Sequence, residues 1–63
     1  METNSRKLLK LLIADGWVVE RVRGDHHNLK KSGVPDLITL PHPKKDLPKG
    51  LVRRIYKIAG WET

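Results

Sequence analysis

The sequence contains no cysteine, which excludes disulfide bonds and a structural zinc site of Cys and His ligands. It has no apolar run close to the ~20 residues that span a membrane, and no apolar signal stretch with a cleavage site at its start. Internal repeats and low-complexity segments are also absent. These absences predict a cytoplasmic protein that binds no membrane and that depends on its apolar core for stability.

Length and charge restrict the architecture and the partners. A chain of 63 residues can form only one domain, which we expect to span residues 1–63, and it buries about 60% of its unfolded surface. Lys and Arg total 13 and Asp and Glu total 7, so the net charge is +6. A polyanion is the natural counterpart of such a charge, and an acidic protein is the other class of partner that fits it.

Two segments have the apolar spacing of helices. We expect Asn4 or Ser5 to cap the first helix and Gly16 to end it, whereas Asp46 caps a last helix that ends at Gly60 and has Pro48 in its first turn. The apolar positions are Leu8, Leu11, Leu12 and Ala14 in the first helix, with Leu9 and Ile13 beside them, and Leu51, Ile55, Ile58 and Ala59 in the last, with Val52 beside them.

Three segments between these helices are rich in strand formers. They are residues 17–23, a second strand that begins at His26, and residues 36–40, where Pro41 stops the strand. Trp17 is interpreted as a core anchor. The sequence therefore predicts an α+β fold of order α-β-β-β-α, in which two helices pack on one face of a three-stranded antiparallel sheet and the other face is open to water.

The two adjacent histidines follow a sharp bend at Gly24. Successive side chains of a strand point to opposite faces, so His26 and His27 point apart. If Leu29 faces the core, His27 is partly buried and His26 is exposed, but a bulge at Gly24 would exchange them. Because the two rings diverge and no cysteine completes a ligand set, we expect no metal site. His42, between two prolines, is either a substrate contact or a rigid turn residue, and we favour the structural role.

Five motifs carry a resemblance to a known family. They are Asp15-Gly16-Trp17, Arg23-Gly24-Asp25-His26-His27, Leu40-Pro41-His42-Pro43, Asp46-Leu47-Pro48-Lys49-Gly50 and Ile55-Tyr56-Lys57-Ile58-Ala59-Gly60. In sequence and order, from about Lys7 to Gly60, the chain resembles the HicA toxins of bacterial type II toxin–antitoxin systems. The resemblance implies a fold like that of double-stranded RNA-binding domains, an endoribonuclease that cleaves mRNA, and inhibition by a HicB antitoxin.

The resemblance also assigns a site. His26, two positions after Gly24, is implied to be the catalytic general acid or base, and His27 is the second candidate because some relatives place the histidine one position later. Serine is common in the family where Asp25 stands, and a carboxylate there either hydrogen-bonds the imidazole or repels an incoming phosphate. The basic residues expected to contact RNA are Arg23, Lys30, Lys31, Lys49, Arg53 and Arg54.

RNA supplies its own nucleophile in the 2′-hydroxyl, so a ribonuclease of this kind needs no metal and no small-molecule cofactor. Two other functions are compatible with the same basic surface. A module that binds RNA without cleaving it, as double-stranded RNA-binding domains do, is the alternative function. A docking surface for an acidic protein is compatible with either one, because an antitoxin bound there would shield His26.

Overall fold

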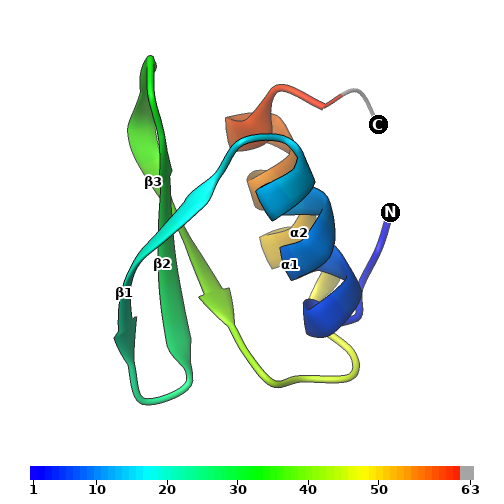
Figure 1. Ribbon diagram of the computed structural model, residues 1–63. Helices are drawn as coiled ribbons and strands as arrows, with labels where there is room; N and C mark the ends of the chain where they lie inside the picture. Colours follow the sequence, from blue (N-terminus) through cyan, green and yellow to red (C-terminus); the bar gives the residue numbers. More distant parts are fainter. Residues whose placement is uncertain (62–63) are drawn as a thin grey trace.

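The computed structural model describes residues 1–61 and has the predicted element order. The elements are α1 (Ser5–Ala14), β1 (Val18–Arg23), β2 (His26–Lys31), β3 (Val34–Pro41) and α2 (Lys49–Ala59). The strands form one antiparallel sheet of order β1-β2-β3, and both helices cover the same face of it (Figure 1). The predicted fold is therefore confirmed. Within the described residues, neither helix is long and apolar enough to cross a membrane.

The helix ends follow from local chemistry, with one correction. The side chain of Asn4 caps α1 by accepting a hydrogen bond from the Lys7 N–H, and Gly60, at φ 78°, ends α2 in the left-handed region. The predicted cap by Asp46 is wrong, because Pro48, expected in the first turn, is itself the N-cap residue of α2, and no side-chain hydrogen bond caps this helix. The N–H of the buried Leu47 donates to the Thr3 carbonyl at 2.8 Å, which ties this segment to the N-terminal chain.

The strand bounds differ slightly from the predicted ones. β1 begins at Val18, because the Trp17 N–H still donates to the Leu12 carbonyl at 3.0 Å and so belongs to the end of α1. β3 is longer than the predicted residues 36–40 at both ends. The register of β1 against β2 shifts between Val19 and Arg21, before the turn at Gly24. No shift follows that point in β1, so the alternation at the two histidines is undisturbed.

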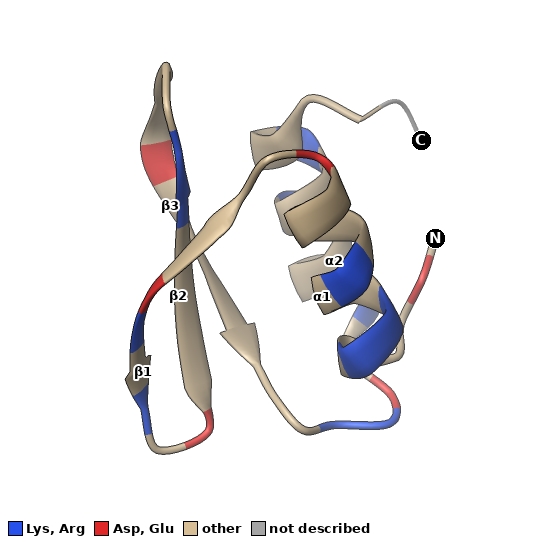
Figure 2. Cartoon of the chain, viewed as in Figure 1, with Lys and Arg blue, Asp and Glu red and all other residues tan. Residues whose placement is uncertain are grey.

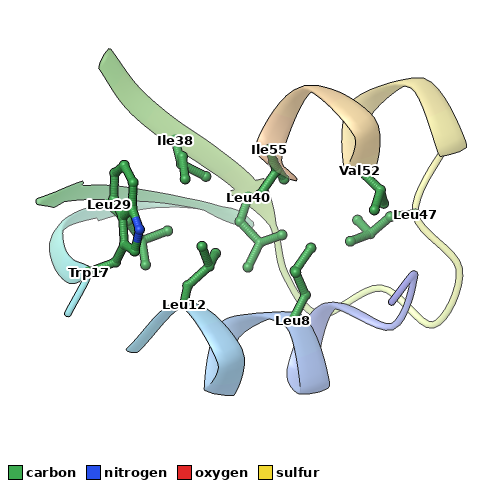
Figure 3. Packing of buried hydrophobic residues seen from close by; sticks show 9 residues of the cluster. All are labelled: Leu8, Leu12, Trp17, Leu29, Ile38, Leu40, Leu47, Val52 and Ile55. Carbon is green, nitrogen blue, oxygen red and sulfur yellow. The ribbon is translucent and has the colours of Figure 1, made fainter. Parts of the chain in front are cut away.

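The core lies between the sheet and the helices (Figure 3). Its nine buried apolar residues are Leu8, Leu12, Trp17, Leu29, Ile38, Leu40, Leu47, Val52 and Ile55. Trp17 is only 2% exposed, which confirms it as a core anchor.

The predicted apolar stripe of α1 is too wide. Leu11 and Ile13 are 46% and 52% exposed, and Ala14 is exposed as well. The buried positions are Ser5, Leu8 and Leu12, three and four residues apart, which form one narrow line along the helix. In α2, only Val52 and Ile55 are fully buried.

Candidate active site

The exposed histidine lies at one end of the sheet, where the hairpin between β1 and β2 turns. The side chain of His26 is 57% exposed, and its Nε2 lies 3.6 Å from Oδ1 of the exposed Asp25. Across the sheet, His26 pairs with Arg23 on β1 and with Pro41 on β3. His26 therefore lies opposite to the helices, with a carboxylate beside it and a guanidinium group on the neighbouring strand.

His27 occupies the other face of the sheet. It is half-buried and pairs with Val22 and Leu40, the latter a core residue. Its ring meets that of His42 edge-on, with centroids 4.9 Å apart and an interplanar angle of 88°. Its Nδ1 is buried and has no hydrogen-bond partner among the described residues. The alternation predicted for the two histidines is thus present, with His26 the accessible one.

His42 holds the loop after β3 in place. Its N–H donates to the Asp25 carbonyl at 2.7 Å, and its Nδ1 lies 2.8 Å from Oγ of Ser5, which is 1% exposed. Ser5 also binds Lys44 through two hydrogen bonds: Oγ accepts from the Lys44 N–H at 2.7 Å, and the Ser5 N–H donates to the Lys44 carbonyl at 2.9 Å. The loop is therefore tied both to the start of α1 and to the turn that precedes His26.

The sequence did not identify Ser5 as part of this arrangement. A serine near the start of a helix is a common cap, and local spacing indicates only that role. Its partners are 37 and 39 residues away in the chain. No local sequence pattern can identify a buried hydroxyl whose hydrogen-bond partners lie so far away in the chain.

The predicted RNA-binding residues do not form one cluster. Arg23 lies beside His26, but Lys30 is at the far end of β2, where its Nζ is 3.4 Å from Oε1 of Glu20. Lys31 forms a hydrogen-bonded ion pair with Asp15 at 3.1 Å, and this bond lowers the pKa of the Asp15 carboxyl. The other three, Lys49, Arg53 and Arg54, are exposed on α2, which lies on the opposite side of the sheet from His26.

The site is thus built around an exposed imidazole that can transfer a proton and an arginine that can stabilise negative charge. Within residues 1–61, no group of three His, Cys, Asp or Glu side chains is placed to hold a metal ion. Such a site suits proton transfer beside an anionic group.

The comparison with known families assigns this α-β-β-β-α domain to a class of bacterial toxins. The family model described as "HicA toxin of bacterial toxin-antitoxin" matches residues 5–61. The chain therefore belongs to the HicA toxin family, as its motifs indicated. A solved structure described as "HicA3 and HicB3 toxin-antitoxin complex" is 43% identical, with a TM-score of 0.78, and the match covers 94% of this chain and 96% of that one. No curated protein sequence matches the chain significantly.

Proposed function

We propose that this HicA-family toxin is an endoribonuclease that cleaves mRNA and that His26 is its general acid or base. The observation that carries the proposal is the placement of His26, which is 57% exposed on the open face of the sheet and paired across the strands with Arg23. His27, in contrast, packs against His42 on the helix side. Membership of the toxin family supports the same activity.

The chemistry requires few groups from the protein. A base removes the proton of the 2′-hydroxyl, which attacks the adjacent phosphorus. The bond from phosphorus to the 5′-oxygen breaks, leaving a 2′,3′-cyclic phosphate, and an acid protonates the departing oxygen. One imidazole performs one of these proton transfers at a time, and it contributes about 10²–10⁴-fold to the rate. We assign to Arg23, which pairs with His26 across the strands, the stabilisation of the extra negative charge on the phosphorus centre.

Regulation by an antitoxin fits the same surface. The solved relative is in a toxin–antitoxin complex. By analogy, we propose a HicB antitoxin as the partner of this chain, bound so that it covers His26 and excludes RNA. The net charge of +6 favours an acidic contact surface on that partner. Added salt should therefore slow the association of the two proteins.

The test compares two histidine variants on RNA in the presence of a chelator. His26→Ala should lose about 10²–10⁴-fold of the cleavage rate. His27→Gln, the matched control on the adjacent residue, should retain most of it. Circular dichroism should show both variants folded.

Three results would contradict the proposal. A folded His26→Ala variant with the original rate would exclude His26 as the catalyst, and loss of activity in His27→Gln alone would transfer the role to His27. Wild-type protein that shifts labelled RNA in a gel without ever shortening it would indicate a binding module without chemistry.

A further inference from the structure

A basic hollow lies beside the candidate active site, between the start of α1 and the loop that follows β3. Its volume is about 450 Å³. We call this cavity the basic hollow. Its lining residues are Asn4, Ser5, Arg6, Lys7, His42, Pro43, Lys44 and Lys45. Four of these eight are Lys or Arg and none is Asp or Glu. Figure 2 shows the same grouping of positive charge on the first turns of α1 and on the loop before α2.

We propose that the basic hollow binds a backbone phosphate of the RNA, next to the phosphate that is cleaved at His26. This inference rests on the proposed function, because it places a second contact on the same substrate. The ligand class is a phosphodiester. Its negative charge is bound by the four cations, and one of its oxygens accepts a hydrogen bond from His42.

The hydrogen bonds of Ser5 prepare His42 as that donor. Ser5 Oγ accepts from the Lys44 N–H and lies 2.8 Å from His42 Nδ1, and in this proposal its hydroxyl donates to that nitrogen. A neutral imidazole that accepts at Nδ1 carries its proton on Nε2. Nε2 has no hydrogen-bond partner among the described residues, and we assign its proton to a phosphate oxygen of the RNA. Because Ser5 is 1% exposed, water does not compete for this arrangement.

The main chain connects the basic hollow to the catalytic turn. The His42 N–H donates to the carbonyl of Asp25, the residue directly before His26, at 2.7 Å. Pro41, directly before His42, pairs with His26 across the sheet. In this proposal an RNA strand passes over this end of the sheet, with His26 on the open face and the basic hollow on the helix side.

The side chains of the basic hollow favour RNA over a protein as the occupant. Strong protein contacts need buried aromatic or large aliphatic anchors, and the hollow offers only Pro43 as an apolar side chain. Two acidic residues lie close in the chain, Glu2 and Asp46. Glu2 Oε2 already accepts from the Asn4 N–H at 3.0 Å, and Asp46 does not line the hollow. A phosphodiester, which is bound by charge and needs no apolar anchor, is therefore the occupant that this lining favours.

The test uses a short RNA oligomer that is 2′-O-methylated throughout, which lacks the nucleophile and so reports binding without cleavage. The variant Arg6→Gln/Lys45→Gln removes one exposed cation from each wall of the basic hollow. The matched control Lys10→Gln/Lys57→Gln removes two exposed cations from elsewhere on the helices. Affinity is measured by fluorescence anisotropy between about 0.05 and 0.2 M salt.

We expect the variant of the basic hollow to bind about tenfold more weakly than wild type near physiological salt, and its salt slope to fall by about 0.7 for each lost phosphate contact. The control should change much less. Equal losses in both variants, or no loss in either, would overturn the proposal. Unchanged RNA binding combined with weaker binding of an acidic antitoxin would assign the hollow to a protein instead.

A second measurement follows His42 itself and separates this inference from the proposed function. Addition of the oligomer should shift the Nε2 resonance of His42 in long-range ¹H–¹⁵N spectra, and Ser5→Ala should weaken binding. An unmoved His42 resonance at saturating oligomer would overturn its role as donor. If His26→Ala cleaves RNA normally while the basic hollow still binds the oligomer, the catalytic assignment fails and the phosphate site stands.

Discussion

The two ends of the three-stranded sheet differ in how their charges are used. At the end where β2 finishes, Lys31 pairs with Asp15 at 3.1 Å and Lys30 pairs with Glu20 at 3.4 Å. We call this the paired end. At the other end, five cations form no ion pair within 4.0 Å with any described residue: Arg6, Lys7, Arg23, Lys44 and Lys45. We call these five, with His26, the basic end.

We interpret the ion-paired cations as residues that support the fold and the unpaired cations as residues that are available to a ligand. Unpaired like charges repel one another, which destabilises the compact state slightly but attracts a polyanion. At the paired end the same kinds of side chain are neutralised within the chain. Loss of the hydrogen-bonded Lys31–Asp15 pair at the paired end should therefore affect stability, whereas changes to exposed cations at the basic end should affect RNA binding.

The largest expected effect on stability is at Trp17, which enters the core directly before β1 at the paired end. Trp17→Ala should cost about 3–5 kcal/mol of the free energy of unfolding. A domain of this size rarely holds more than about 3–5 kcal/mol from its core, so the variant should be largely unfolded at 25 °C. Circular dichroism with urea titration measures this. Trp17→Phe, which keeps an aromatic ring, should remain folded, and a well-folded Trp17→Ala variant would show that the anchor lies elsewhere.

Ser5 is an exception to this contrast between the two ends, because it lies near the basic end but supports the fold. Ser5→Ala leaves the Lys44 N–H and His42 Nδ1 without their partner and should cost about 1–3 kcal/mol in urea titrations. Ser32→Ala, in an exposed turn, is the matched control and should be near neutral. Equal stability of the two variants would mean that the loop after β3 is held by other contacts.

Much of this fold was predictable because it depends on local patterns. Alternation along β2 placed His26 and His27 on opposite faces, and the glycines marked the helix ends. The α1 stripe was predicted too wide because helical spacing shows which residues are apolar but not how far the sheet extends beneath them. Leu11 and Ile13 lie outside that contact and are exposed.

The candidate site was predictable only in part. The motif around Gly24 identified His26, but two features depend on residues distant in the chain. Ser5 meets its partners in the loop after β3, and Lys31, expected to contact RNA, meets Asp15 at the end of α1. Side-chain pairing across elements depends on how the helices are placed on the sheet, and no local sequence pattern contains that placement.

The Asp15–Lys31 pair predicts a pH dependence of stability. The hydrogen bond from Lys31 lowers the pKa of Asp15 below its ordinary value of 3.8, so the folded protein binds this proton more weakly than the unfolded chain does. The stabilisation is complete above that ordinary value and is lost as the pH falls through the folded-state pKa. Asp15→Asn should reduce stability at pH 7 and flatten its decline between about pH 5 and 3.

Urea titrations across that pH range measure the effect. Asp36→Asn, at an exposed carboxylate of β3 that forms no ion pair with a described residue, is the control and should follow the wild-type curve. Parallel pH curves for Asp15→Asn and wild type would show that the ion pair does not contribute in solution.

The smallest expected effect comes from breaking the ion pair of Lys30 at the paired end, which would leave Lys30 unpaired like the cations of the basic end. Glu20→Gln removes the partner of Lys30, whose side chain is 55% exposed. An exposed ion pair contributes about 0–1 kcal/mol, so stability in urea should hardly change. Binding of the methylated oligomer should rise a few-fold at low salt if the RNA extends along the open face to Lys30, since a neutralised cation becomes available there.

The variant Glu20→Gln/Lys30→Gln provides the contrast, because it removes both charges and should return binding to the wild-type level. Unchanged affinity in Glu20→Gln would confine the RNA to the basic end and exclude Lys30 as a contact. A gain in affinity that persists in the double variant would have to come from the lost carboxylate alone. In that case Glu20 would act on RNA by repulsion and not by holding Lys30.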